Sequence, residues 1–191
     1  MSKIPKAAPR EQPAEGTYPF VCVQVIDLGT QPSKVEKYGD THWVQLALEL
    51  VEERTSDNQP MVVYTRFNYI NTPRSKLTKT LKAWLNVKDL DNFDMERCLG
   101  AAGMVTIVHN EHEGNTYANV QTMTALPKGM KVKKHSEPLI SLFLDESFDE
   151  DVLGELPEFL QTMIKASPEY KALQEAPKTK AKTKVATKKK K

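Results

Sequence analysis

The sequence predicts a mainly β domain of five short strands with one helix between the third and fourth strands, followed by a flexible, charged C-terminal tail. Three observations predict it: strict alternation of apolar and other residues in 42–52, further β-branched and aromatic runs without helical period, and a single stretch with helical spacing at 72–85. All of these lie within residues 17–126, which is a length that suits one compact domain.

The first three expected strands are 17–28, 42–52 and 60–70. The clearest is 42–52, where four apolar residues alternate with a second set that consists of Trp43, Gln45, Ala47 and Glu49. Because side chains alternate across a strand, we expect the apolar set to face the core and the second set to face outward.

The expected helix follows the third strand. Thr72 can cap it, Pro73 suits its first position, and an apolar stripe follows at Leu77, Leu81, Trp84 and Leu85, which assigns Trp84 to the core. Two more strands, 103–109 and 116–126, are separated by a polar turn at 110–115 and predict a hairpin with a loop of about five or six residues.

Three strands, a helix and two strands are the element order of an OB-fold barrel, and an α+β sandwich with the same order stays open as an alternative. Around this OB-fold domain, residues 17–134, we expect four further segments: a flexible arm 1–16, an acidic linker 135–155, a short amphipathic helical segment 156–174 and a disordered Lys-rich tail 175–191. The apolar residues of the helical segment include Phe159, Met163 and Ile164, and Pro168 interrupts the pattern.

The net charge of +2 is small because acidic and basic segments of the chain cancel each other. Residues 135–159 hold eight acidic and no basic side chains, whereas residues 177–191 hold eight lysines and no acidic ones. Within the domain, no acidic residue occurs between Asp57 and Asp89, while basic and aromatic residues are interleaved there. Cations beside aromatic rings suit a polyanion with bases that can stack, although a solvated face whose aromatics are core fits the same window.

An OB-fold binds its ligand on the outer side of the second and third strands, bordered by two loops. We expect Tyr64 and Arg66 to face that ligand and Phe67 and Tyr69 to face the opposite way, because a buried Arg66 would need a partner. The full set of candidate nucleic-acid-binding residues is Lys34, Lys37, Tyr38, Trp43, Tyr64, Arg66, Arg74, Lys76, Lys79 and Tyr117.

Enzyme motifs are scarce. The chain has no GxxxxGK[ST], GxGxxG or GxSxG motif, so we expect no enzyme, cofactor or metal. His109 and His112 could serve a metal-dependent nuclease, but a polar hairpin tip is the favoured interpretation.

Cys22 and Cys98 are far apart and predict reduced, buried thiols. No apolar run suits a membrane span or a secretory signal, so we expect a cytoplasmic protein.

Several segments together resemble the bacteriophage single-stranded DNA-binding proteins, a family of small replication and recombination proteins. They are VIDLG at 25–29, YG at 38–39, LKAWL at 81–85, LG at 99–100, VHNEHEGNTYANV at 108–120, LPKGMK at 126–131, LPEF at 156–159 and SPEY at 167–170. The resemblance covers about residues 15–134 and part of 156–170, and implies an OB barrel in the cytoplasm of a bacterial host. These motifs are structural, so no binding residue is carried over.

The leading hypothesis is therefore non-enzymatic, sequence-tolerant binding of single-stranded DNA in phage replication or recombination. An adaptor that docks a partner through the C-terminal segment is the alternative, and the nuclease is the third. Proteins of this kind commonly end in an acidic tip, whereas here the acidic block 145–158 is internal. We expect it to compete for the basic surface or to recruit replication and recombination proteins. The sequence leaves open whether the chain forms a homo-oligomer.

Overall fold

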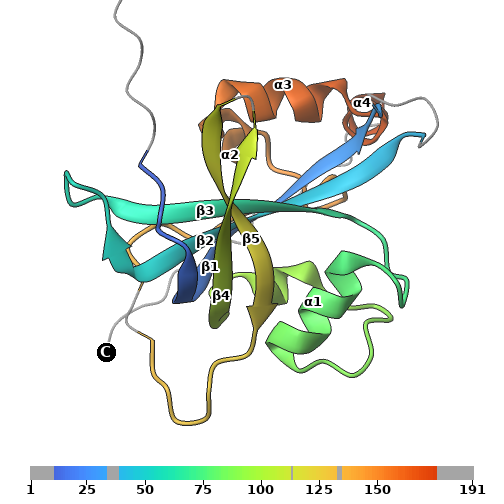
Figure 1. The fold of residues 1–191 in the computed structure, drawn as a ribbon. Coiled ribbons are helices and arrows are strands. Elements are labelled where there is room, and N and C mark those ends of the chain that lie inside the picture. Colours follow the sequence, from blue (N-terminus) through green and yellow to red (C-terminus); the bar gives the residue numbers. More distant parts are fainter. Residues whose placement is uncertain (1–10, 34–38, 113, 133–134, 176–191) are drawn as a thin grey trace, which may run out of the picture.

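The computed structural model describes residues 11–33, 39–112, 114–132 and 135–175 (Figure 1). These residues form a mainly β fold with one six-stranded sheet and four short α-helices. The strands are β1 (Gly16–Gln31), β2 (Thr41–Arg54), β3 (Pro60–Asn68), β4 (Ala102–His112), β5 (Asn115–Thr124) and β6 (Ile140–Leu142). The helices are α1 (Lys76–Leu85), α2 (Glu150–Glu155), α3 (Glu158–Ala166) and α4 (Pro168–Glu175), with a 3-10 helix, η2, at Met95–Cys98.

Five strands lie in the order β3-β2-β1-β4-β5, and each neighbouring pair is antiparallel. The short strand β6 pairs in parallel with β1. The edge strands β3 and β5 contact each other, but within the described residues no hydrogen-bonded ladder joins them, so the sheet is open. The prediction of a mainly β fold with a helix between the third and fourth strands is confirmed, and a closed barrel is not.

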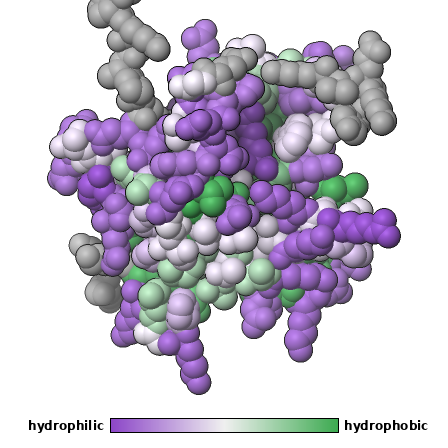
Figure 2. All heavy atoms as spheres, viewed as in Figure 1, coloured by the Kyte–Doolittle hydropathy of each residue, from purple (hydrophilic) through white to green (hydrophobic). Residues whose placement is uncertain are grey.

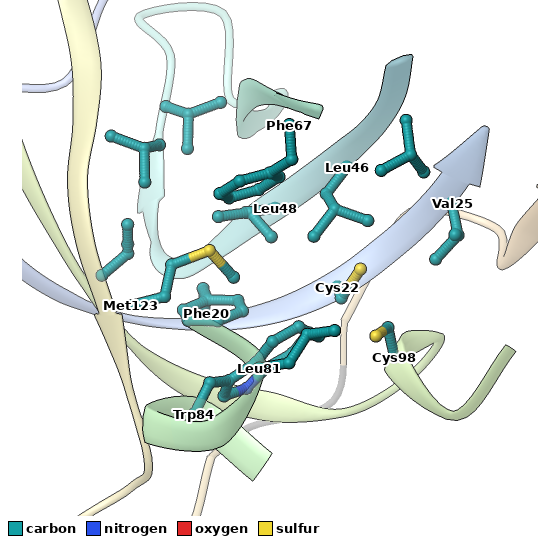
Figure 3. Packing of buried hydrophobic residues seen from close by; sticks show 14 of the residues in the cluster. Phe20, Cys22, Val25, Leu46, Leu48, Phe67, Leu81, Trp84, Cys98 and Met123 are labelled. Carbon is teal, nitrogen blue, oxygen red and sulfur yellow. The ribbon is translucent and has the colours of Figure 1, made fainter. Parts of the chain in front are cut away.

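The main core lies between the inner faces of the strands and α1 (Figure 3). Trp84 is 2% exposed, as its place on the apolar stripe predicted, and its indole N–H donates to the carbonyl oxygen of Ala102 at 2.9 Å. Its ring lies 5.3 Å from that of Phe20. Cys22 and Cys98 are both free and buried, as expected, and burial raises the pKa of Cys98 to about 12.

Two predicted boundaries are wrong. Ser75, not Thr72, caps α1: its hydroxyl oxygen accepts a hydrogen bond from the Thr78 backbone N–H at 3.0 Å, and Pro73 lies before the helix. The hairpin loop is also shorter than expected, because β4 continues to His112 and β5 begins at Asn115. The polar residues at 111–112 thus extend a strand, although polar residues are typical of a turn.

The chain after residue 135 packs against the outer face of β1. Residues 135–155, where a linker was expected, contain β6 and α2. A second buried cluster forms there between β1 and the C-terminal elements, and its buried members are Ile26, Leu28, Leu142, Leu153, Leu156, Leu160 and Ile164. The break at Pro168 was predicted correctly, since α3 ends at Ala166 and α4 begins at Pro168. No helix in the described ranges is long and apolar enough to cross a membrane.

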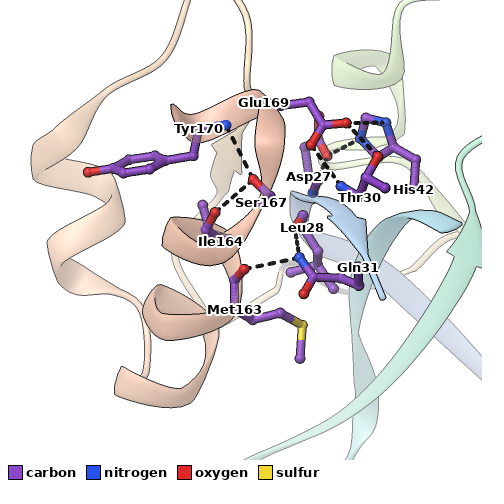
Figure 4. Close-up of polar contacts among 11 residues, drawn as sticks. Asp27, Leu28, Thr30, Gln31, His42, Met163, Ile164, Ser167, Glu169 and Tyr170 are labelled. Carbon is purple, nitrogen blue, oxygen red and sulfur yellow. Dashed lines mark hydrogen bonds and ion pairs between the residues drawn. The ribbon is translucent and has the colours of Figure 1, made fainter. Parts of the chain in front are cut away.

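The C-terminal helices pack closely against the end of β1, where side chains of one element contact the backbone of the other (Figure 4). Gly29 has φ of 67°, and a Cβ at this position would lie 2.5 Å from the Ser167 side chain, so the approach requires glycine. The Gln31 side-chain amide donates to the carbonyl oxygen of Met163 at 3.0 Å. The VIDLG and SPEY segments therefore meet in space, which gives both of them a structural role.

A polar network completes this attachment (Figure 4). The Glu169 carboxylate accepts hydrogen bonds from the Thr30 backbone N–H at 2.8 Å and hydroxyl at 2.5 Å. His42 Nε2 lies 2.6 Å from an Asp27 carboxylate oxygen, and His42 Nδ1 lies 3.6 Å from Glu169. The hydrogen bond with Asp27 raises the pKa of His42 above its usual 6.5, although partial burial opposes this. The helices α3 and α4 thus contact β1 and the start of β2 through both polar and apolar side chains.

Candidate nucleic-acid interface

The outer face of β2 is largely covered and reaches the groove described below only at Gln45, which corrects the prediction for this strand. Gln45, Ala47 and Glu49 are 3%, 0% and 0% exposed. Trp43 is half-buried and packs against the second cluster beneath the C-terminal helices, so it is not an open stacking platform. The physical reason is that the segment after residue 130 covers this face of the sheet.

The polar side chains on this covered face have hydrogen-bond partners. Glu49 accepts hydrogen bonds from the backbone N–H groups of Ser136 at 2.8 Å and Glu137 at 2.7 Å, and Arg54 lies 3.5 Å away. In the described part of the chain, no buried side-chain nitrogen or oxygen lacks a partner. Satisfied polar groups explain how a strand with an alternating pattern can be buried on both faces.

The outer face of β3 remains open. Tyr64 is 43% exposed and Arg66 is exposed, whereas Phe67 is 2% exposed and Tyr69 is half-buried, so the predicted orientation of this strand is confirmed. Arg66 Nε donates to the Gln45 side-chain oxygen at 2.9 Å, which links the guanidinium group to β2. Desolvation lowers the pKa of Arg66, but an arginine stays charged at neutral pH.

A groove of about 360 Å³ runs beside these two residues. On the sheet side it is lined by Gln24, Gln45, Tyr64 and Arg66. On the helix side it is lined by Pro157, Phe159 and Leu160. None of these lining residues of the described chain is acidic, and Arg66 supplies a positive charge. The groove thus combines two aromatic rings, two amides and one guanidinium group.

The basic residues around α1 form a separate exposed group. Arg74, Lys76 and Lys79 are all exposed, and none of them lines the groove. The Lys76 ammonium lies 5.7 Å from the centre of the Phe67 ring and donates to the carbonyl oxygen of Val120 at 3.4 Å. This places it where β3 and β5 approach each other.

Four predicted residues remain, of which the structure describes only Tyr117. Tyr117 on β5 is 47% exposed, in agreement with its expected outward orientation, but it lies outside the groove. Lys34, Lys37 and Tyr38 lie outside the residues that the structure describes. The structure therefore places Tyr64 and Arg66 together and leaves Tyr117 and the α1 cations at other positions.

His109 contacts two residues of the N-terminal segment. Its Nε2 atom lies 2.8 Å from the carbonyl oxygen of Pro13, and its backbone N–H donates to Glu15 at 2.7 Å. Among the described residues, no group of three or more His, Cys, Asp or Glu side chains is placed to hold a metal ion. The observed contacts of His109 therefore join the β4–β5 hairpin to the N-terminal segment.

The groove also contains residues that the sequence did not suggest. Phe159 was assigned to the apolar stripe of its helix, but it is 60% exposed, and Leu160 and Ile164 are the buried positions of α3. The sequence did not identify Gln24 of β1 as a candidate binding residue, because a single glutamine in an apolar strand forms no distinctive pattern. The LPEF segment was the one available indication, since it belongs to the resemblance described above.

Neither a protein-family model nor a curated protein matches this chain. The function is therefore inferred from the geometry of the groove and the chemistry of the side chains around it.

Proposed function

We propose that this protein binds single-stranded DNA with little sequence preference, without catalysis, in phage replication or recombination. The observation that carries the proposal is the pair Tyr64 and Arg66, both exposed on the outer face of β3 and both lining one groove. An aromatic ring can stack on any base, and a guanidinium group can contact phosphate or stack on a base. The assignment to phage replication comes from the resemblance of the sequence segments.

The connectivity of the strands supports an OB-type binding surface. The strand β1 pairs with both β2 and β4, while β3 and β5 contact each other at the open edge. Closing that edge would produce the five-stranded OB barrel, with α1 inserted between β3 and β4. In that fold the ligand crosses the face of the second and third strands, which is where the groove lies.

The positive charge around α1, which lies outside the groove, also suits a polyanionic partner. The exposed cations Arg74, Lys76 and Lys79 precede or belong to α1, and no acidic residue occurs between Asp57 and Asp89. Phosphates contacted there would release counterions, so affinity should fall with salt by a slope of about −0.7 per phosphate neutralised.

The test is a fluorescence anisotropy titration of the full chain with labelled oligo-dT, a matched RNA and a matched duplex. We expect single-stranded DNA to bind most tightly, and Tyr64→Ala to weaken it by about 5- to 150-fold, the equivalent of one lost stacking contact. Arg66→Ala should weaken binding and reduce the salt slope, whereas Lys171→Ala on α4 removes the same charge outside the groove and should have little effect. Equal affinity for duplex, or no binding of oligo-dT, would refute the proposal.

No contact in the described structure favours the adaptor or the nuclease. An adaptor would use the apolar side of the C-terminal segment, but Leu160 and Ile164 pack against β1 within the same chain. The side of the molecule shown in Figure 2 is mostly hydrophilic, with hydrophobic residues in small groups. A nuclease would use His109, which contacts Pro13. We therefore propose neither.

A further inference from the structure

The helix side of the groove lies outside the five-stranded unit. Pro157, Phe159 and Leu160 come from the start of α3, whereas the opposite side comes from β1, β2 and β3. The helix lies about 90 residues after Tyr64 in the sequence, and the acidic block 145–158 ends where it begins. A segment in this position can either cover the binding surface or form part of it.

The helix is attached firmly and does not fill the groove. Leu160 and Ile164 are 2% and 0% exposed and anchor α3 to β1. The Gln161 amide donates to the carbonyl oxygen of Leu156 at 2.8 Å, which fixes the turn between α2 and α3. Beside this anchored helix the groove retains about 360 Å³, within the range of about 300 to 1,000 Å³ typical of small-molecule pockets.

Phe159 is the unusual residue of this helix. It is 60% exposed, while the neighbouring Leu160 is buried, so its ring does not contribute to the packing of α3 on the sheet in the way that Leu160 does. It lines the same groove as Tyr64, which is 43% exposed, and Arg66, which is also exposed. Two exposed rings in one groove with a cation are the arrangement that binds stacked bases next to phosphates.

We propose that α3 forms one side of the single-stranded DNA site and that Phe159 is a base-stacking residue of it. The inference rests on the proposed function and extends it: the occupant is a nucleobase of single-stranded DNA, held in a groove between the sheet and the C-terminal helix. Gln24 is half-buried and can donate or accept a hydrogen bond through its amide, whereas Gln45 is 3% exposed and its side-chain oxygen accepts from Arg66. The C-terminal segment then contributes to binding and does not compete with DNA at this groove.

The test compares three substitutions of Phe159 in the full chain by anisotropy with labelled oligo-dT. Phe159→Ala and Phe159→Leu should each weaken binding by about 5- to 150-fold, because both remove the ring and leucine keeps an apolar side chain. Phe159→Trp should bind like the wild type, and its added emission should be quenched by the oligonucleotide. Met130→Ala, which truncates a residue that is 46% exposed outside the groove, should leave affinity unchanged.

The outcomes separate this inference from the proposed function. If the wild type binds and Tyr64→Ala weakens binding, but the Phe159 substitutions leave it unchanged, the inference is wrong and the function stands. Tighter binding by Phe159→Ala also overturns the inference, because α3 would then obstruct the groove. If the wild type does not bind oligo-dT, both proposals fail. Circular dichroism melts of each variant control for folding, which an exposed side chain should not alter.

Discussion

The attachment of the C-terminal segment depends on Glu49, and its removal gives a sharp prediction. The Glu49 carboxylate is 0% exposed and faces two backbone donors, the N–H groups of Ser136 and Glu137, at 2.8 and 2.7 Å. Hydrogen bonds to a charged group contribute about 1.5 to 3 kcal/mol each. Glu49→Ala removes both and should therefore lower the free energy of unfolding by about 3 to 6 kcal/mol.

A milder substitution and a control make the measurement decisive. Glu49→Gln keeps one oxygen that can accept a hydrogen bond, so we expect a loss of about 1.5 to 3 kcal/mol. Glu52→Ala removes the same charge from an exposed position of the same strand and should change stability by no more than about 0.5 kcal/mol.

The assay is urea unfolding at pH 7, followed by circular dichroism and analysed by linear extrapolation. Hydrogen exchange of β6 should accelerate in Glu49→Gln, because the donors at Ser136 and Glu137 lie just before this strand. A Glu49→Ala protein within about 1 kcal/mol of the wild type would show that the buried carboxylate does not hold the segment, and the reasoning would be refuted.

Two further predictions concern residues of β2. The raised pKa of His42 means that its contact with Asp27 stabilises the fold fully below about pH 6.5 and loses this effect as the pH rises through the higher folded-state pKa. The stability difference between wild type and His42→Gln, measured by urea midpoints from about pH 5.5 to 8.5, should therefore shrink with rising pH, and a constant difference would contradict the assignment. Trp43→Phe should lower stability by about 1 kcal/mol and leave the affinity for oligo-dT nearly unchanged, because Trp43 packs against the second cluster. A large loss of affinity at unchanged stability would contradict this.

The strands were predictable from alternation in β2 and from β-branched and aromatic composition in the others. In β3, Tyr64 and Arg66 share one face and Phe67 the other, and the argument that an arginine avoids burial selected the correct outward face. The helix was predictable from the spacing of Leu77, Leu81 and Trp84, but its first residue was not. Thr72 and Ser75 both carry a hydroxyl group that can cap, and only the observed hydrogen bond to Thr78 distinguishes them.

The C-terminal segment was predicted less well, for two physical reasons. The strand β6 has three residues, which is too short for any periodicity to appear. In α3, the apolar residues Phe159, Leu160, Met163 and Ile164 span more than one face of a short helix, so the pattern alone does not say which ring points to solvent. The acidic composition of residues 135–155 also favoured a linker, although Leu142 and Leu153 from this range are buried members of the second cluster.

The sequence by itself determined that this protein is mainly β, that one helix separates the third and fourth strands, and which residues of β2 and of β3 share a face. Local periodicity carries this information, because the side-chain period of a strand is two. Only the tertiary structure decided which outer face is open. Gln45 and Glu49 look like solvent-facing residues in the sequence, yet they are buried by a segment that begins more than 80 residues later. No local pattern encodes that partner, and the same long-range packing brings Phe159 to the groove beside Tyr64.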